Sequence, residues 1–548
     1  MLVTPHLVQQ RGCVRLLVVG MLIVVSVVVL KLVRPHQRFP GGASLRLFKP
    51  GLSTPSTPST CHPELTAIDG LASDLTPAFR YSRRCVQPVF RPEHTSSSHA
   101  AVRRKAAAMT GQLIPDDSVV INRTARCGLP EPLPCEPLLL DVPQPYPAKG
   151  NFSHLLFGVA SSHGRMLKAL DGLAHWLGGT EAQLVAIVQE QDEEGDERVT
   201  NKNREKRKDT QRQLAGLERA YRARGVHLTA LPPQNQAART VVQNHFAVLT
   251  VLLEAATPST QWLGIVDDDT FVPSLYKLDA TLAKYDHTRP TWLGALSEDF
   301  DAVARWGYMA YGGAGVFVSV PLARDLEPHM GQCLEQKTGE RVGGPMTRDV
   351  VSSSKSKADW KTTGDGLLRD CIYRYTTTKL TVVPGLYQHD LYGDLAGFYE
   401  SGVLPLSVHH WRSWYKAPLP AMAAVNRLCG DCFLGRYLWE ESPDKKAKKH
   451  VTLLSNGYSI TQYRAKPDLS HMELTWSHAG SEFDFSLGPL RPALEETQKK
   501  SYRLKEAIFD GKTGKLRQVY VYKGDFLTDE MDEVFELVWQ MDSKSKDT

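Results

Sequence analysis

Short apolar runs begin to alternate with helix-like segments at about residue 150. The runs at residues 154–161, 182–189 and 226–231 are apolar along most of their length. Runs of this kind are typical of strands that are buried in a sheet. The pattern therefore predicts three strands in the core of one domain.

Two segments between these runs carry apolar residues at helical spacing. Their apolar residues are Leu214, Leu217 and Tyr221 in the first, and Val242, Phe246, Leu249 and Leu253 in the second. Gly225 follows the first segment where a helix C-cap is expected. A further apolar run, WLGIV at residues 262–266, follows the second. Strands that alternate with helices in this way predict an α/β domain built on a mainly parallel sheet.

Beyond about residue 417 the pattern changes to the alternation that strands show. The alternating segments are HVTLLSNGYSITQY, MELTWS, FDFSLG and RQVYVYKGDF. The closing segment DEMDEVFELVWQ, residues 529–540, has the pattern of a helix. We therefore expect an α/β domain over residues 151–418 and a small β-rich extension over residues 419–548. The extension carries no recognisable chemical motif.

The N-terminal part differs in composition from both of these regions. Residues 16–30 are apolar and uncharged, which predicts a transmembrane anchor over residues 14–33 behind a cytoplasmic tail at residues 1–13. A cleaved signal peptide is the alternative, but no clear small-x-small site follows the run. The tract GLSTPSTPST lies in a region with little hydrophobic periodicity, so residues 34–150 are expected to form an extended stem and pre-domain segment.

The charge of the chain argues against one class of function. The net charge is only +5 over 548 residues, and no concentrated basic face is visible. Nucleic-acid binders usually show such a face. An acidic run from Glu190 precedes a basic run from Asn203, and the pair predicts a solvated insert.

Sequons and cysteines are compatible with an oxidising, lumenal compartment. The sequons begin at Asn122 and Asn151, and the chain has nine cysteines. The spacing of Cys127 and Cys135, and of Cys429 and Cys432, predicts two short disulfide loops. A redox or zinc-binding CxxC is the alternative for the second pair, but no further Cys or His pair completes four ligands.

The first candidate site is the run of three aspartates in WLGIVDDDTFVP. In an extended segment Asp267 and Asp269 point the same way, and Asp268 points the opposite way. Two converging carboxylates repel each other unless a cation lies between them, and Mn²⁺ or Mg²⁺ prefers oxygen ligands. Ligands of α/β sheets bind beyond the carboxyl ends of the strands, which is where this run lies. An acidic loop without a ligand is the simpler alternative.

A glycine-rich stretch follows in WGYMAYGGAGVFVSV. Its glycines Gly312, Gly313 and Gly315 let a backbone approach a ligand closely or adopt a positive φ. No Lys-Ser or Lys-Thr follows, so the stretch is not a Walker phosphate loop. A strand or a helix start is expected directly after it.

Two further motifs contain residues that could take part in chemistry. Asp365 lies between two glycines in TTGDGLLRDCIYR, at the start of a predicted helix, where an N-cap is the simplest role. His409 and His410 precede Trp411 in LPLSVHHWRSW, and a pair of histidines is more often structural than ligating.

The order of these motifs resembles the Fringe-like glycosyltransferases of glycosyltransferase family 31. DDD is followed by GGAG, then by GD before an amphipathic segment, then by HHW, and LFGVASSHGRM, LGALSED and CGDCF add to the likeness over residues 151–433. The resemblance implies a GT-A fold and an inverting transfer from a UDP-sugar with Mn²⁺, typically forming a β-1,3 linkage to a glycan or glycoprotein. The anchor and stem fit a type II membrane protein of the Golgi or ER.

The resemblance also implies roles for individual residues. Asp269 corresponds to the direct metal ligand, and His410 to the metal-binding histidine, although an offset of one would select His409. Asp365 corresponds to the catalytic base, which takes a proton from the acceptor hydroxyl. The residues implied for the nucleotide-sugar are Asp267, Asp268, Arg165, Gly312, Gly313 and Gly315, and those implied for Mn²⁺ or another divalent cation are Asp267, Asp269 and His410.

Two features depart from the family pattern, and one competing interpretation remains. Residues 337–361 form a long polar segment ahead of Asp365, which is either a lid that orders on substrate binding or an insertion without function. Gly366 stands beside the base, where the family often has a second acidic residue. The competing interpretation is a non-catalytic lumenal scaffold or glycan-binding protein. A metal-dependent hydrolase fits less well, because the histidines and carboxylates do not cluster as a two-metal site requires.

Overall fold

The structure is a computed structural model of the chain. It describes residues 74–91, 105–122, 133–147, 149–189, 203–233, 241–335, 363–441, 450–477, 487–525 and 530–540. The chain divides into residues 1–59 and 60–548, and every described residue lies in the second unit. The predicted tail, anchor and Ser/Thr/Pro tract lie outside the described residues, as does the polar segment at 337–361. No helix within the described ranges combines the length and the apolar character needed to span a bilayer.

One sheet forms the centre of the predicted α/β domain. Its strands are β5 (Leu155–Ser162), β6 (Gln183–Gln189), β7 (His227–Leu231), β8 (Trp262–Ile265), β9 (Trp292–Gly294), β10 (Val316–Ser319) and β11 (Leu380–Val382). They lie in the order β11-β9-β10-β8-β5-β6-β7. Strands β5 to β8 run parallel to one another, and β10 lies antiparallel between β8 and β9. The predicted α/β class and the first three predicted strands are confirmed.

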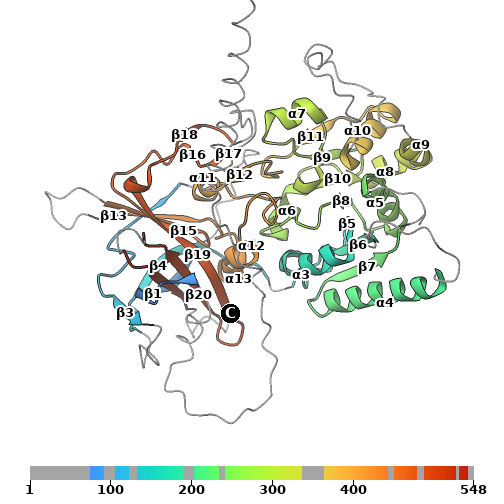
Figure 1. The fold of residues 1–548 in the computed structure, drawn as a ribbon. Coiled ribbons are helices and arrows are strands. Elements are labelled where there is room, and N and C mark those ends of the chain that lie inside the picture. Colours follow the sequence, from blue (N-terminus) through green and yellow to red (C-terminus); the bar gives the residue numbers. More distant parts are fainter. Residues whose placement is uncertain are drawn as a thin grey trace, which may run out of the picture. The chain divides into compact units, whose positions relative to one another are not determined.

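Helices cover both faces of this sheet (Figure 1). One face carries α3 (His163–Leu177), α4 (Asn203–Arg222) and α6 (Leu275–Leu282), and the other carries α5 (Val241–Ala255), α8 (Val320–Leu326), α9 (Met330–Glu335) and α10 (Gly364–Tyr375). Leu155 and Phe157 of β5 pack into the first core, and Leu156 packs into the second. This alternation is the two-residue period of a strand. The basic run from Asn203 forms the first part of α4, whereas the acidic run before it lies outside the described residues, so the solvated insert stays a prediction.

A second, ten-stranded sheet combines both ends of the described chain. From the N-terminal side come β1 (Ala78–Arg91), β2 (Ala107–Met109), β3 (Val119–Asn122) and β4 (Pro137–Pro143). From the C-terminal side come β13 (Arg436–Glu441), β14 (His450–Ser455), β15 (Ser459–Tyr463), β19 (Lys499–Asp510), β20 (Lys515–Tyr522) and β21 (Glu533–Trp539). The β-rich character predicted for residues 419–548 is thus observed, but the sheet also recruits part of the predicted stem.

The prediction of an extended stem does not hold for the residues that form β1, β2, β3 and β4. Strand β1 runs parallel to β21, and its residues Phe79, Tyr81 and Val86 are buried. Tyr81 bonds Glu536, a residue 455 positions later in the sequence. A strand with so distant a partner cannot be recognised from its local pattern, because that partner supplies both its hydrogen bonds and its burial.

The closing segment is strand β21, and the predicted helix over residues 529–540 was wrong. This strand lies between β1 and β20, and residues 534–539 are all buried. A strand covered on both faces reads as a continuous apolar run, which spacing alone cannot distinguish from a buried helix.

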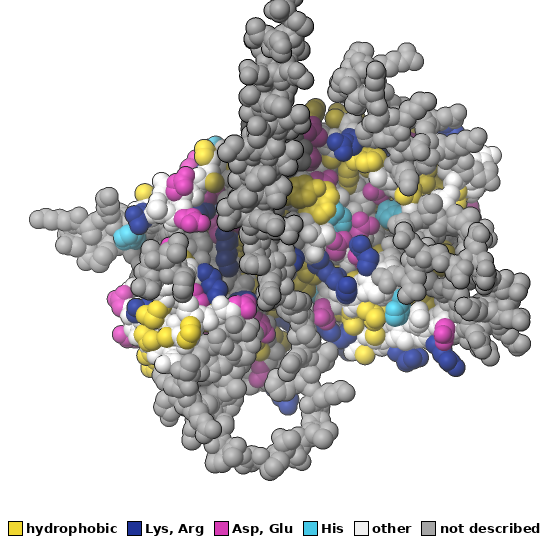
Figure 2. Space-filling view, in the orientation of Figure 1, with side chains coloured by type: hydrophobic (Ala, Val, Ile, Leu, Met, Phe, Trp, Pro, Cys, Tyr) yellow, Lys and Arg dark blue, Asp and Glu magenta, His cyan; other side chains and the backbone are white. Residues whose placement is uncertain are grey.

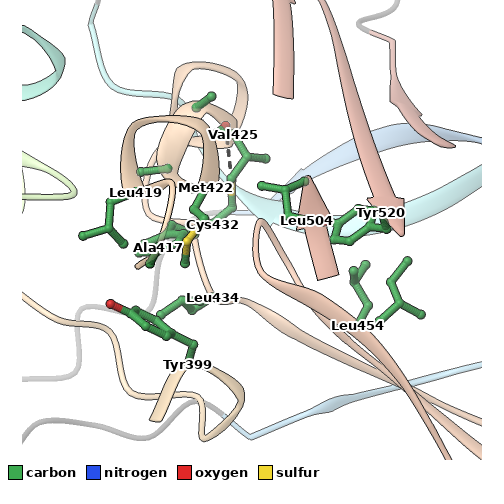
Figure 3. Packing of buried hydrophobic residues seen from close by; sticks show 14 of the residues in the cluster. Tyr399, Ala417, Leu419, Met422, Val425, Cys432, Leu434, Leu454, Leu504 and Tyr520 are labelled. Carbon is green, nitrogen blue, oxygen red and sulfur yellow. Dashed lines mark hydrogen bonds between the residues drawn. The ribbon is translucent and has the colours of Figure 1, made fainter. Parts of the chain in front are cut away.

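One hydrophobic core joins the segments that follow the first sheet to the second sheet. It contains Phe271 and Val408 from the α/β region together with Trp539 from the second sheet. Figure 3 shows part of this core, in which the short helical segments α12 (Leu419–Met422) and η4 (Ala423–Val425) face Leu504 and Tyr520. The remaining elements are α7 (Phe300–Trp306), α11 (Ala396–Glu400), α13 (Asn426–Cys429), β12 (Tyr392–Gly393), β16 (Met472–Leu474), β17 (Trp476–Ser477), β18 (Leu490–Pro492) and the 3₁₀ turns η2 (Gly312–Ala314), η3 (Glu327–His329) and η5 (Glu496–Gln498).

Three disulfides lie within the described residues. Cys429 and Cys432 form the predicted short loop, which confirms a structural disulfide there. Cys135 pairs with Cys85 of β1 rather than with Cys127, so that part of the disulfide prediction was wrong. The third disulfide, Cys333–Cys371, joins α9 to α10. The Cys85 pairing depends on the fold of β1, which the sequence spacing did not reveal.

A buried charge cluster on β21 provides a test of the second sheet. Glu536 is 1% exposed and accepts hydrogen bonds from Tyr81 and Arg517, with Arg83 at 3.3 Å. Glu536→Gln removes the charge that compensates two buried guanidinium groups, so the free energy of unfolding should fall by about 3 to 5 kcal/mol. Denaturant unfolding measures the change, and exposed Glu496→Gln is the control. A Glu536→Gln variant as stable as this control would show that the cluster does not stabilise the sheet.

Candidate functional site

The three aspartates follow β8 in a tight turn. The backbone N–H of Asp267 donates to Thr270 Oγ1 at 2.9 Å, and the Thr270 hydroxyl donates to the Gly313 carbonyl at 2.9 Å. The Thr270 N–H closes the turn on the Asp267 carbonyl at 3.1 Å. Because β8 lies between β5 and β10, the turn stands at the centre of the sheet, beyond the end of a parallel strand. This is the position at which α/β sheets bind ligands.

Asp268 turns away from its two neighbours, toward the start of α3. Arg165 donates to it from Nε at 2.6 Å and from Nη2 at 2.7 Å, and Ser161 of β5 donates a further hydrogen bond. The side chain of Ser162 caps α3 by accepting from the Arg165 N–H. The Asp268 charge is therefore already compensated within the protein, although 62% of the Arg165 side chain is exposed.

A β-bridge brings the aspartates next to the histidines. Phe271 and Val408 exchange both backbone hydrogen bonds, each at 2.9 Å, in an antiparallel pair. Residues just before Phe271 therefore lie opposite residues just after Val408. Two segments far apart in the sequence are joined in this way, and Asp269 meets His409.

Asp267, Asp269 and His409 form the centre of the candidate site. His409 Nε2 lies 2.9 Å from Asp269 Oδ1 and 3.3 Å from Asp267 Oδ2. In octahedral coordination with metal–ligand distances of about 2.1 Å, neighbouring ligand atoms are about 3 Å apart. The observed separations fit such an arrangement. Figure 2 shows histidine and acidic side chains gathered in the region where Figure 1 labels β5 and β8.

His410 completes a group of three possible metal ligands. One donor atom from each of Asp269, His409 and His410 lies within 4.8 Å of the others. The His410 ring is also held by its surroundings, with Nε2 3.1 Å from Asp390 Oδ1 and Nδ1 3.2 Å from Ser413 Oγ. Both histidines offered by the sequence thus lie at the site, and His409 makes the closer contacts with the aspartates.

The electrostatics of this group favour a positive charge. Burial opposes protonation of His409, but Asp267 and Asp269 outweigh it and raise its pKa to about 10. Burial also acts to raise the pKa of Asp267, but hydrogen bonds from His245 and His409 hold it well below its usual value. Carboxylates that stabilise a protonated imidazole so strongly also favour a metal cation, which would displace the proton from that imidazole. The donor set and its field therefore fit a divalent cation.

Asp365 lies on the other side of the glycine turn. It is the second residue of α10, whose N-cap is Thr363, so an N-cap role for Asp365 was wrong. Its Oδ2 accepts from the Gly312 N–H at 3.0 Å, whereas its buried Oδ1 makes no hydrogen bond. Burial raises the pKa of Asp365, and the charge of His245 opposes that rise. One oxygen of a fixed, buried carboxyl group therefore accepts no hydrogen bond.

His245 on α5 links the two groups, and the sequence reasoning missed it. Its Nε2 lies 3.3 Å from Asp267 Oδ1 and its Nδ1 lies 3.7 Å from Asp365 Oδ1. Burial opposes its protonation, but these two carboxylates raise its pKa to about 9. The sequence offers a single histidine in a largely apolar helix, which does not distinguish a site residue from a core residue.

The turn needs glycine at positions 312 and 313, because side chains of the site pack directly against its backbone. A Cβ atom on Gly313 would lie 2.0 Å from Nδ1 of His409, and one on Gly312 would lie 2.7 Å from Oδ1 of Asp365. Gly315 has φ of +96°, a conformation that side chains rarely adopt. These positions let the backbone pack closely against His409 and Asp365, which the sequence alone could not distinguish from an approach to a ligand.

A buried polar network contacts His410 and holds the segment next to it. The sequence analysis did not predict this network. Glu298 accepts from the backbone N–H groups of Gln388 at 3.0 Å and His389 at 2.7 Å. Asp390 follows directly and accepts from Ser297 at 2.6 Å as well as contacting His410. Burial and the nearby Asp390 raise the pKa of Glu298 to about 8. The string LGALSED carried part of this network, although no role could be assigned to it from the sequence.

Comparison with protein families supports the class that the site suggests. Residues 226–350 match a family model described as Fringe-like. The predicted resemblance is therefore confirmed over this segment, which holds the three aspartates and the glycine turn but ends before Asp365 and His410. The match supports a glycosyltransferase.

Comparison with solved structures finds glycosyltransferases of low sequence identity. GlyE from Streptococcus pneumoniae TIGR4 aligns at 11% identity over 51% of this chain and 60% of its own, with a TM-score of 0.27. The mannosyltransferase PcManGT from Pyrobaculum calidifontis, in complex with GDP-Man and Mn²⁺, aligns at 15% identity over 34% and 49%, with a TM-score of 0.21. This chain thus spans 60% of the length of GlyE. At these TM-scores the likeness is not used to assign a glycosyltransferase function. No curated protein matches the sequence.

The contact between Gly313 and His409 gives a test of the cation site. Gly313→Ala would place a methyl group where the imidazole lies, so it should displace His409 and weaken Mn²⁺ binding by about 10- to 100-fold. Isothermal calorimetry with Mn²⁺ measures the effect. Gly331→Ala is the matched control, since a Cβ there meets no atom within 4 Å. Equal Mn²⁺ affinity in the two folded variants would exclude His409 from the cation site.

Proposed function

We propose that this protein is an inverting, metal-dependent glycosyltransferase with a GT-A fold. It would transfer a hexose or an N-acetylhexosamine from a UDP-sugar to a hydroxyl of a glycan or glycoprotein, in a β-1,3 linkage. The Fringe-like match and the geometry of the site support a glycosyltransferase. The donor class and the linkage rest on the resemblance to family 31.

The observation that carries the proposal is the state of the Asp365 carboxyl group. Gly312 fixes Oδ2, and the buried Oδ1 has no hydrogen-bond donor of its own. An acceptor hydroxyl is the donor that this oxygen lacks. In a single displacement, Asp365 takes the hydroxyl proton while the acceptor oxygen bonds to the anomeric carbon. The bond from that carbon to UDP breaks, and the configuration inverts.

The opposite side of the site would bind the diphosphate. Asp269, His409 and His410 would hold the cation, with Asp267 beside them. A bound divalent cation neutralises the charge that develops on the departing diphosphate. Arg165 forms an ion pair with Asp268. The Arg165 side chain is also partly exposed, so it could contact the nucleotide. Gly312 and Gly313 serve this arrangement by letting the turn pack against the base and against a histidine.

The proposed location is the lumen of the Golgi or the ER, on a type II membrane anchor. The apolar run at residues 16–30 and the exposed sequon residue Asn151 support it. Sensitivity of the full-length chain to endoglycosidase, with protection from protease in intact microsomes, tests this part of the proposal.

The first experiment is calorimetric binding of UDP to the detergent-solubilised chain, with and without Mn²⁺. UDP should bind only with Mn²⁺, and Asp269→Ala should weaken it by more than about 100-fold, because a direct ligand is lost. Asp325→Ala, which removes an exposed carboxylate on α8, is the matched control. If UDP binds equally well without Mn²⁺ and in Asp269→Ala, the three aspartates are an acidic loop, and a non-catalytic scaffold is favoured.

A second variant separates catalysis from nucleotide binding. Asp365→Asn preserves the size of the side chain but removes the base, so Mn²⁺-dependent UDP binding should persist while transfer falls by about 10²- to 10⁴-fold. Transfer is followed as UDP release across a panel of UDP-sugars and glycan acceptors. Release that requires an acceptor indicates transfer, whereas release without one indicates hydrolysis. Undiminished transfer in Asp365→Asn would exclude this residue as the base.

A further inference from the structure

Exposed aromatic side chains are concentrated near the site. Among the large hydrophobic residues exposed in the described part of the chain, the aromatic ones are Phe300, Tyr308, Tyr392 and Trp414. Each lies within four positions of a residue already placed at the site or in its support: Glu298, Gly312, Asp390 and His410 respectively. Exposed aromatic rings on loops around a catalytic site favour a ligand with an apolar face.

Two of these rings form a continuous column with the metal-binding histidines. The rings of His409 and His410 have centroids 3.8 Å apart, and His410 stacks on Trp414 at 3.9 Å with planes 6° apart. Trp414 in turn stacks with Tyr392 at 4.4 Å and 8°. Trp414 is 37% exposed and Tyr392 is 39% exposed. The column therefore leads from the cation site to the surface of the protein.

The order of the central sheet separates this column from the nucleotide side. Ser161 and Arg165 follow β5, on one side of β8. Tyr392 follows β11, on the far side, and the Gly312 turn that holds Asp365 precedes β10 on that same side. The exposed rings thus share their side of the site with the proposed base, and it is the acceptor that must reach this base.

A small two-stranded sheet, separate from the ten-stranded one, holds this part of the chain in place. Strand β12 pairs with β17, with Tyr392 opposite Ser477. Thr475 donates to the Asp394 carbonyl at 2.7 Å and accepts from the Gly397 N–H at 2.9 Å. A Cβ on Gly397 would lie 1.7 Å from the Glu473 carbonyl oxygen, so the two segments are in direct contact. A strand fixed in this way presents its ring with little entropy left to lose on binding.

We propose that the ring face of Tyr392 that points away from Trp414 forms a stacking subsite for a pyranose ring of the acceptor glycan, with Trp414 packed behind it. A pyranose presents C–H groups on its ring face, and the negative faces of aromatic rings attract them. The subsite rests on the proposed function, since it names the substrate that Asp365 would deprotonate.

Saturation-transfer NMR on the full chain in detergent tests the subsite, with UDP and Mn²⁺ present. The probes are the methyl β-glycosides of galactose, glucose, N-acetylglucosamine and N-acetylgalactosamine. At least one should receive saturation mainly on the C–H groups of one ring face. Tyr392→Ala should weaken its binding roughly tenfold, whereas Tyr392→Phe should preserve it because the ring remains.

Tyr375→Ala is the matched control, because it also removes a tyrosine from a stacked pair, with His329 at 3.9 Å and 5°. It should leave the saturation pattern unchanged. The subsite is overturned if no probe is saturated by the parent chain, or if Tyr392→Ala binds as the parent does. Mn²⁺-dependent binding of UDP is measured on the same samples. If it persists while the subsite fails, the proposed function stands, and if it is absent, the proposed function fails on its own account.

Discussion

Mutual repulsion among buried carboxylates is the constraint on which the rest of the site depends. Asp267, Asp269 and Asp365 come from two elements and meet around one turn, where their charges would oppose folding if nothing balanced them. His245 lies between Asp267 and Asp365, and His409 lies between Asp267 and Asp269. Each imidazole is thus shared by two carboxylates. A site arranged in this way is stable with protons on its histidines, and it is prepared to exchange one of them for a metal cation.

The β-rich region has a physical role in this arrangement even though it carries no chemical motif. The Phe271–Val408 bridge, which sets Asp269 against His409, lies in the core that packs against the second sheet. A second bridge, between Leu386 and Ser407, aligns the Asp390 segment with the histidines. Since ligand geometry must be held closely for a cation to bind, a large buried core beneath these bridges provides rigidity that loops alone would lack. The second sheet is therefore a frame for the site.

What could be predicted from the sequence was local. The strands at β5, β6 and β7 follow from short apolar runs, and the opposed directions of Asp268 and its neighbours follow from the two-residue period of an extended chain. What could not be predicted depends on distant partners. Strand β1 is defined by β21, and His245 belongs to the site only because α5 crosses beside the turn after β8. Asp365 looked like a cap because the sequence cannot show that Thr363 already fills that position.

The three consecutive aspartates at the end of β8 have different partners, which explains how the fold accommodates their charges. Asp268 is neutralised by Arg165 and Ser161, so it contributes little net field to the cation site and instead ties the turn to α3. Asp267 and Asp269 remain to face the histidines. If all three faced one way, the extra carboxylate would over-bind a cation or force a proton onto the site. The alternation of an extended strand thus divides one acidic run between a carboxylate that anchors the turn and two carboxylates that face the histidines.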